Sequence, residues 1–379
     1  MGTDRWSPTS AQRAKSAPGT LCLGSPGSGK TFMMQNAAMN TMAMGQRLVA
    51  IDPKNDFAKV HRVFPNVKVI DLCHVQPGSL NPFEFLKKIN PDTNQLEYLD
   101  EMTLLTIIQL LVGTKKMSTE AENAITPIIR DYVLKAKNGE SVNLYRLAEY
   151  LYSKDNMYAQ NIGQTMKSYV DSNVGKLLFN TEDVKPLVIS NTDSLVISLM
   201  GMKLPSYDTK IEDYSMEDNL TTAIVYIITK KLREMLLRPN KIPVLFICDE
   251  AHMLFGNKEM SKVIDEFLVL GRSLGVSTML ASQGITHFPE GISNYITSKF
   301  LFKSSLDESK EFFRRFDTSK DDPTNRITDS IVTAIPKLPQ GVCFFMDRFD
   351  RNGIIHITSL YPPEVFEGEF VPGENFVLR

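Results

Sequence analysis

Eight residues near the start of the chain have the types and spacing of a phosphate-binding loop, in which a glycine is followed by four residues and then by glycine, lysine and threonine. They are Gly24-Ser25-Pro26-Gly27-Ser28-Gly29-Lys30-Thr31. The glycines let backbone N–H groups turn toward phosphate oxygens at the positive end of a helix dipole. We expect Lys30 to reach the β- and γ-phosphates of ATP and the Thr31 hydroxyl to bind Mg²⁺.

A pair of carboxylates, Asp249 and Glu250, follows an apolar run at 244–248. Such a run predicts a buried parallel strand, and ligands bind at the carboxyl ends of parallel strands. We expect Asp249 to hold Mg²⁺ through water and Glu250 to polarise the attacking water as a general base. A strand followed by a solvated acidic turn is the alternative. The presence of Lys30 and Thr31 in the same chain favours catalysis, and the acidic pair favours hydrolysis over nucleotide storage.

Two further polar residues stand where they could take part in the same chemistry. Gln283 ends a predicted strand at 276–281, where it could sense the γ-phosphate or its water; the alternative is an ordinary turn glutamine. Arg272 ends a predicted helix, and its guanidinium could stabilise a γ-phosphate bound by a neighbouring subunit. The alternative is a cation that the helix dipole favours at a C-terminus. Arg314 and Arg315 are weaker candidates for the same role.

Two other features have open interpretations. His252 could couple the two carboxylates to a neighbouring element, although a lone histidine after a strand is more often a packing or capping residue. The segment Asp52-Pro53-Lys54-Asn55-Asp56 ends the second predicted strand. It could approach the phosphates or the base, but its spacing slightly favours a strand-ending turn with a helix N-cap.

The elements that must position these residues alternate between strand and helix along most of the chain. This alternation predicts an α/β fold with a mostly parallel sheet flanked by helices. Between 94 and 185 the apolar residues recur at helix spacing instead, which predicts an all-helical inserted subdomain. Predicted strands lie at 21–23, 47–51, 67–72, 195–199, 244–248, 276–281, 300–302, 342–346 and 354–357, and long helices at 216–237 and 262–274.

These patterns predict three parts of the chain. Residues 1–18 are small and polar, as in a flexible lead-in or a cloning remnant. The ATPase domain takes residues 19–93 and 186–379. The helical insertion subdomain takes residues 94–185 and separates the two halves of the ATPase domain.

The composition narrows the range of partners. The chain has 379 residues, a formal net charge of −2 and 42% hydrophobic residues, enough for a large core. The near-neutral charge gives no electrostatic argument for binding DNA. The sequence has no apolar run long enough to span a bilayer, so we expect no direct membrane insertion. The four cysteines are far apart and predict neither a disulfide framework nor a zinc site, which fits a reducing cytoplasm.

The order of several motifs along the chain is typical of a known family. They are the loop at 24–31, Asp52-Pro53-Lys54-Asn55-Asp56-Phe57, Leu80-Asn81-Pro82-Phe83, Asp249-Glu250-Ala251-His252, Gly271-Arg272-Ser273-Leu274-Gly275 and Ser282-Gln283. In this order they resemble the motor domain of the conjugation ATPases of type IV secretion systems, the VirB/TraC/TrbE group. The resemblance extends from Thr20 to the C-terminus and includes the helical insertion.

The resemblance implies a RecA-like P-loop NTPase fold, assembly into a hexamer or dimer, and work with secretion-channel proteins of the bacterial inner membrane. The protein would then be cytoplasmic and peripheral at the inner face of the cell membrane, held there by partners. The resemblance also favours Arg272 as the arginine that acts across a subunit interface. Two features depart from the pattern: His252 stands where the family often has tryptophan, and Asp52-Pro53-Lys54 leans toward the TraG-type coupling proteins, which pump DNA.

The sequence therefore predicts a Mg²⁺-dependent ATPase that powers channel assembly or substrate transfer. A DNA translocase of the FtsK, HerA or TraG kind is the alternative, with DNA as a partner that the net charge does not support. A third, non-enzymatic hypothesis is a scaffold in which bound ATP locks an oligomer without turnover.

Overall fold

The computed structural model describes most of the chain between its two ends. The described residues are 19–89, 96–97, 99–182, 184–206, 208–238, 242–255, 258–316, 329–347 and 351–368. The lead-in predicted at 1–18 lies outside them. Contacts between residues divide the chain into two compact units. We call these the sheet unit (Met1–Ile70, Asn191–Met200 and Met235–Arg379) and the helical unit (Asp71–Ser190 and Gly201–Glu234).

The helical unit defined by contacts is larger than the helical subdomain predicted from the sequence at 94–185. Residues 71–93, 186–190 and 201–234 belong to the helical unit, whereas the sequence analysis assigned them to the ATPase domain. The functional boundaries at 94 and 185 stay a prediction, because a compact unit is defined by packing and not by activity.

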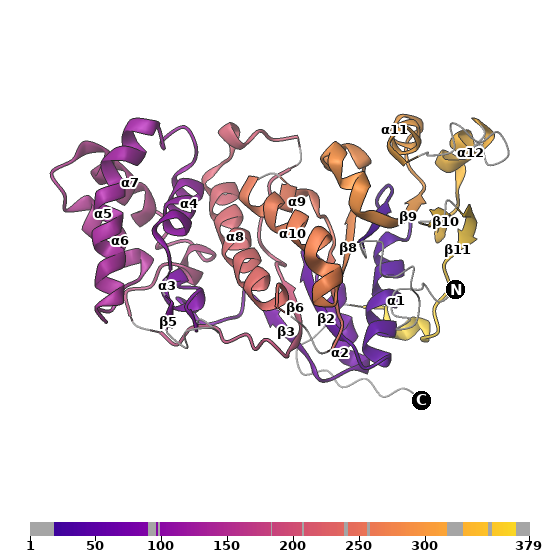
Figure 1. Cartoon of the computed structure of the whole chain (residues 1–379), viewed down its shortest axis with the longest axis horizontal. Helices are drawn as coiled ribbons and strands as arrows, with labels where there is room; N and C mark the ends of the chain where they lie inside the picture. The colour runs from indigo at the N-terminus through magenta and orange to yellow at the C-terminus, as the bar shows by residue number, and fades with distance from the viewer. Residues whose placement is uncertain are drawn as a thin grey trace. The chain divides into compact units, whose positions relative to one another are not determined.

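A mostly parallel sheet forms the centre of the sheet unit (Figure 1). Within the described residues its strand order is β11-β10-β9-β1-β8-β7-β2-β6-β3. The strands are β1 (Gly19–Leu23), β2 (Arg47–Asp52), β3 (Val67–Asp71), β6 (Ser194–Ser198), β7 (Val244–Cys248), β8 (Val276–Ser282), β9 (Ile296–Phe302), β10 (Val342–Met346) and β11 (Asn352–His356). Neighbours from β9 to β6 are parallel, whereas β10 is antiparallel to β9 and β11. The predicted α/β fold with a mostly parallel sheet is confirmed.

Helices cover both faces of this sheet. The helices of the sheet unit are α1 (Lys30–Ala43), α2 (Val60–Val63), α9 (His252–Phe255), α10 (Lys258–Leu274), α11 (Leu306–Phe316) and α12 (Asp329–Ala334). On one face, Met34 of α1 shares a buried cluster with Leu245 and Ile247 of β7. Successive strand residues point to opposite faces, and Phe246 accordingly packs its ring edge-on against Phe267 of α10, with 5.0 Å between centroids. Two covered faces explain why β7 is apolar throughout instead of alternating.

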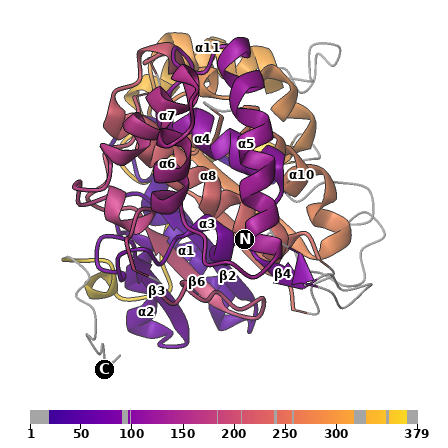
Figure 2. The ribbon, with the colours of Figure 1, turned by 90° about the vertical axis from the view of Figure 1, so that its left-hand side faces the viewer.

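The helical unit is built around four helices that pack on one another (Figure 2). They are α4 (Glu101–Val112), α5 (Thr119–Lys137), α6 (Leu144–Tyr152) and α7 (Met157–Lys167). Each begins after a side chain that accepts a backbone N–H bond from three residues further on, and the capping residues are Asp100, Ser118, Asn143 and Asn156. These caps satisfy otherwise unpaired N–H groups, so the starts of the helices are set by local sequence.

Among the described residues, the helical unit also contains two further α-helices and a short antiparallel pair of strands. These are α3 (Pro82–Phe85), β4 (Lys88–Ile89), β5 (Leu96–Glu97) and α8 (Met216–Leu236), which ends just inside the sheet unit. Asn81 explains part of the motif that precedes α3: its side chain caps the helix at Phe83 N and donates a hydrogen bond to the carbonyl oxygen of Val142 at 3.0 Å. Among the described residues, the helices are too short or too polar to cross a membrane.

Candidate nucleotide site

The loop that joins β1 to α1 has the backbone that the sequence predicts. Gly24, Gly27 and Gly29 have φ angles of 150°, 72° and 111°, which residues with a Cβ seldom adopt. Lys30 folds back over the loop, and its Nζ donates hydrogen bonds to the carbonyl oxygens of Gly24 at 2.5 Å and Ser25 at 3.1 Å. The loop therefore curves around the lysine ammonium, as a phosphate-binding loop requires.

Two of these glycines differ in the space around them. A Cβ at Gly24 would lie 2.7 Å from the Cβ of Phe302 in β9, closer than real Cβ atoms approach. A Cβ at Gly27 would meet no atom within 4 Å. The two positions share a demanding backbone conformation, but only Gly24 is also closely packed.

We expect Gly24→Ala to lower the free energy of unfolding by about 3 kcal/mol, because a clash with β9 adds to the backbone strain. Gly27→Ala is the matched control and should lose only about 1 kcal/mol, the strain alone. Urea unfolding in the absence of nucleotide measures both. Equal losses for the two variants would contradict the close packing of Gly24.

Strand β7 brings the predicted carboxylates to this loop. Thr31 Oγ1 donates a hydrogen bond of 3.0 Å to Asp249 Oδ2, although the two residues are 218 positions apart in sequence. Asp249 and Glu250 are 2% and 7% exposed. Burial and the charge of Glu250 raise the pKa of Asp249, and burial lowers the pKa of Lys30. The structure thus gathers Lys30, Thr31, Asp249 and Glu250, as the sequence analysis expected.

Glu250 is held in an unusual conformation by two cationic or basic neighbours. Its φ of 54° is left-handed, which is uncommon away from glycine. Oε1 accepts a hydrogen bond from Lys54 Nζ at 2.7 Å, and Oε2 lies 3.5 Å from His252 Nδ1. Burial acts to raise the pKa of the Glu250 carboxyl, but contacts with His252 and Lys54 outweigh it and lower the pKa to about 2. Glu250 is therefore ionised near neutral pH, as a general base must be.

Lys54 contacts Glu250, although the sequence analysis named it only as part of the segment at 52–56 and gave it no separate role. Asp52, at the end of β2, accepts hydrogen bonds from four backbone N–H groups between residues 54 and 58. Burial raises the pKa of Asp52 to about 7, against the opposing effect of these donors. The segment is thus the strand-ending turn that its spacing favoured. Because β2 lies beside β7, the same turn also brings Lys54 to Glu250. In the sequence, the only sign of this contact was a lysine at the end of a predicted strand.

Gln283 lies at the same edge of the sheet. Strand β8 runs between β1 and β7, and Leu23 pairs with Ser282 across the β1–β8 ladder. Gln283 therefore follows β8 at the level where the loop follows β1, and its side chain is exposed. This is the place from which it could contact a γ-phosphate, and that role stays a prediction.

His252 connects the carboxylate to β8. Its ring lies edge-to-face with the ring of His287, with 5.6 Å between centroids. His287 Nδ1 lies 2.6 Å from Ser282 Oγ at the end of β8. A line of contacts thus runs from Glu250 through two histidines to the strand that carries Gln283, which supports the coupling interpretation of His252.

The three arginines named from the sequence have different surroundings. Arg272 lies in the last turn of α10 with its side chain exposed, and no hydrogen bond or ion pair to another part of the described chain engages it. Arg314, in α11, is paired with Glu290 and Glu311 at 2.6 Å each. Arg315 is only 9% exposed. Arg272 is therefore the one of the three that is available for a contact with another molecule.

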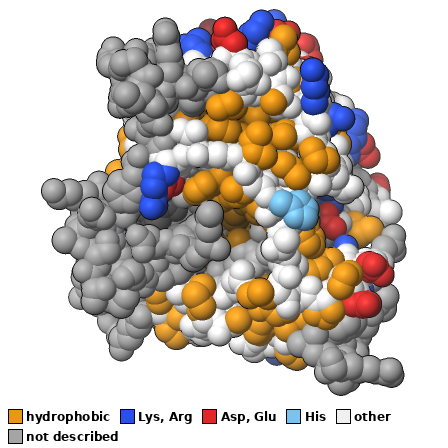
Figure 3. Space-filling model, turned by 90° about the vertical axis from the view of Figure 1, so that its right-hand side faces the viewer, with side chains coloured by type: hydrophobic (Ala, Val, Ile, Leu, Met, Phe, Trp, Pro, Cys, Tyr) orange, Lys and Arg blue, Asp and Glu red, His pale blue; other side chains and the backbone are white. Residues whose placement is uncertain are grey.

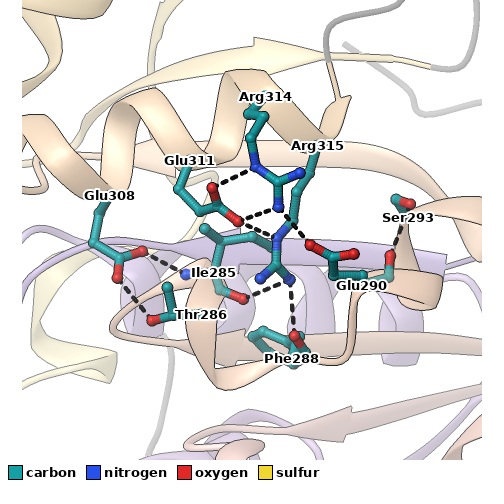
Figure 4. A network of polar contacts seen from close by, with 9 residues as sticks. All are labelled: Ile285, Thr286, Phe288, Glu290, Ser293, Glu308, Glu311, Arg314 and Arg315. Atoms are coloured by element: carbon teal, nitrogen blue, oxygen red, sulfur yellow. Dashed lines mark hydrogen bonds and ion pairs between the residues drawn. The ribbon is translucent and has the colours of Figure 1, made fainter.

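Arg315 belongs to a polar network that ties the segment after β8 to α11 (Figure 4). It donates to Glu311 Oε1 at 2.7 Å and to the carbonyl oxygens of Ile285 and Phe288 at 3.2 and 2.8 Å. Glu308 accepts the N–H of Ile285 at 2.7 Å. Hydrogen bonds from its two arginine partners lower the pKa of Glu311 to about 2. Its charge therefore stabilises the fold above the ordinary carboxyl pKa, and this contribution is lost only as the pH falls toward 2.

We expect Arg315→Met to lower the free energy of unfolding by about 2 kcal/mol, because the carbonyl oxygens of the buried residues Ile285 and Phe288 each lose the guanidinium donor. Arg314→Met removes only exposed ion pairs, which solvent screens, so it should lose far less than Arg315→Met. Denaturant unfolding measures both losses, and limited proteolysis reports whether the segment at 285–288 has loosened. A larger loss for Arg314→Met would contradict this assignment.

The oxygen atoms at this site fit Mg²⁺ better than they fit a metal ion whose ligands are all protein side chains. Among the described residues, no cluster of three or more His, Cys, Asp or Glu side chains is arranged to hold a metal ion. Mg²⁺ uses few protein ligands, prefers oxygen and completes its shell with water and phosphate. The adjacent hydroxyl of Thr31 and carboxylate of Asp249 provide such oxygens.

The sequence matches a family described as an AAA-like domain over residues 11–367. Among curated proteins, none matches the chain in sequence. The matched range includes the loop, both carboxylates and Arg272, and it covers more than half of the chain.

The solved structures with a similar fold include those of VirB4 and TrwB. VirB4 of Thermoanaerobacter pseudethanolicus aligns with a TM-score of 0.68 and 14% identity, over 96% of this chain and 94% of that one. The bacterial conjugative coupling protein TrwB, in a form named TrwBdeltaN70, aligns with a TM-score of 0.56 and 14% identity, over 94% of this chain and 88% of that one. Identity this low establishes a shared fold only.

Proposed function

Because the chain is a P-loop ATPase that belongs to the family of AAA-like domains, we propose that it hydrolyses ATP with Mg²⁺ to power a bacterial type IV secretion or conjugation machine. One observation carries the hydrolytic part: the hydrogen bond from Thr31 to Asp249, which sets the buried Glu250 beside the phosphate-binding loop. The order of the motifs and the likeness in fold to VirB4 and TrwB support the type IV part.

The residues of the site divide the work of hydrolysis. Residues 24–29 and Lys30 would hold the phosphates, and Thr31 and Asp249 would hold the metal ion. Mg²⁺ would neutralise charge on the β- and γ-phosphates. Glu250 takes the proton of the water whose oxygen bonds to the γ-phosphorus, and ADP leaves as the bond to the bridging oxygen breaks. Gln283 contacts the γ-phosphate or that water.

Self-association completes the proposed site. Arg272 is exposed and unengaged within the described residues, so it is suited to reach the nucleotide of a neighbouring subunit. Figure 3 shows hydrophobic side chains gathered on the side of the molecule that carries β11, one of the two edge strands of the sheet within the described residues. Ile354 of β11 and the nearby Leu360 are 52% and 90% exposed. Exposed apolar surface of this kind supports a contact between subunits, in a dimer or a hexamer.

The proposed function implies a location in the cell. We infer a cytoplasmic protein that is peripheral at the inner face of the bacterial cell membrane and reaches it through inner-membrane channel proteins. The absence of a spanning helix among the described residues fits this arrangement.

A DNA translocase is the second candidate function. The fold likeness to the coupling protein TrwB favours it, as does the turn at Asp52-Pro53-Lys54. The net charge of −2 does not. The two functions differ in their response to DNA, because a translocase couples turnover to its track.

The test is steady-state ATP hydrolysis against protein concentration, with and without single- and double-stranded DNA. Turnover that rises with concentration and ignores DNA would support the secretion ATPase. Strong stimulation by DNA would favour the translocase. Tight ATP binding without turnover at any concentration would favour the scaffold.

A further inference from the structure

We propose that Lys54 binds the γ-phosphate of ATP, and that it exchanges the Glu250 carboxylate, its partner in the structure, for that phosphate when ATP binds. The exchange would release Glu250 to act on water only after a triphosphate has arrived. This inference rests on the proposed ATPase function and adds a residue to it.

The base of Lys54 is fixed relative to the phosphate-binding loop. The Asp52 carboxylate holds the backbone of the turn through four N–H groups. On the other side, Gln35 of α1 donates a hydrogen bond of 2.8 Å to the carbonyl oxygen of Asp56. Helix α1 begins at Lys30, so the turn that carries Lys54 is attached to the same helix whose first residues belong to the loop.

The tip of Lys54 is free to move. Its side chain is 55% exposed, whereas the side chain of its partner Glu250 is 10% exposed. An exposed lysine can change partner by rotating about its flexible four-carbon stem. Lys54 contacts Glu250, the residue after Asp249, and Asp249 accepts a hydrogen bond from Thr31, the residue after Lys30. Lys54 and Lys30 therefore border the same space, where we place the β- and γ-phosphates.

The partner exchange has a simple electrostatic cause. The γ-phosphate carries more negative charge than one carboxylate and offers three oxygens to a point-like ammonium. While Lys54 donates a hydrogen bond to Glu250 Oε1, the ammonium stabilises the carboxylate charge and makes that oxygen a weaker acceptor of a proton from water. The other oxygen, Oε2, is buried and faces His252 Nδ1 at 3.5 Å, so Oε1 is the oxygen that the exchange makes available.

The decisive measurement is the affinity for two nucleotides that differ only in the γ-phosphate. We would measure the Kd of Mg-ADP and of a non-hydrolysable β,γ-methylene ATP analogue by calorimetry on the whole chain. For Lys54→Met we expect the analogue to bind roughly tenfold more weakly and ADP to bind unchanged, because a charged hydrogen bond to the γ-phosphate is lost. We also expect kcat to fall about 10²-fold, and Lys54→Arg to recover most of the preference for the analogue.

Lys68→Met is the matched control. Lys68 is 58% exposed and makes an ion pair of 2.8 Å with Asp193, whose side chain is 14% exposed, so it resembles Lys54 in all but location. It should leave both affinities and kcat unchanged. Equal weakening of ADP and the analogue in Lys54→Met would overturn the proposal, as would a rise in kcat, which would indicate a purely inhibitory contact. Failure of the unmodified chain to bind or hydrolyse ATP would instead remove the proposed function itself.

Discussion

Glu250→Gln is expected to lower kcat about 10³-fold while leaving the affinity for ATP within a factor of about three. The amide has the shape of the carboxylate but cannot accept a proton from the attacking water. It also keeps an oxygen for Lys54, which now binds Glu250 at 2.7 Å, so the fold around the site should survive. Nucleotide binding and single-turnover hydrolysis, measured on the same preparation, separate the loss of chemistry from a loss of binding.

Glu259→Gln is the control for this substitution. Glu259 lies on α10, is 39% exposed and pairs with Lys262, so its loss should leave kcat unchanged. Unchanged turnover in Glu250→Gln would remove Glu250 as the base. ATP binding without any turnover by the unmodified chain would instead support the scaffold hypothesis.

Arg272→Ala is expected to lower kcat about 10³-fold without changing the affinity of a single subunit for ATP, because an arginine supplied in trans stabilises charge in the transition state. Its side chain is exposed and unengaged within the described chain, so the fold should be unaffected. Activity against protein concentration, together with circular dichroism, checks both expectations.

A mixing experiment tests whether Arg272 acts on a neighbour. Lys30→Ala should be inactive because its own phosphate site is damaged, yet it keeps Arg272. Mixed with Arg272→Ala, whose phosphate site is intact, it should restore turnover well above the sum of the two variants. Arg314→Ala should remain active, because Arg314 is held by Glu290 and Glu311. No recovery on mixing, or inactivity of Arg314→Ala, would move the trans role away from Arg272.

Local sequence was sufficient to predict the fold class and the centre of the site. The glycines of the loop could be recognised because their chemistry is local: positive φ angles are needed within a few residues, and glycine adopts them readily. The run before Asp249 could be recognised as a strand because both of its faces are covered by helices. Two such local features, joined by the rule that ligands bind at the carboxyl ends of parallel strands, were enough to predict that Thr31 and Asp249 meet.

Contacts between residues that are distant in sequence determined the features that local sequence patterns could not predict. The sequence alone established a P-loop strand, an acidic pair and a mostly parallel α/β fold. It did not establish the strand order, so it could not show that β2 lies beside β7 and brings Lys54 to Glu250. It also could not separate Arg272 from Arg315, because both end helices and differ only in what surrounds them. The physical reason is the same in each case: hydrogen bonds and ion pairs between distant residues depend on which elements become neighbours, and only the packed tertiary structure determines that.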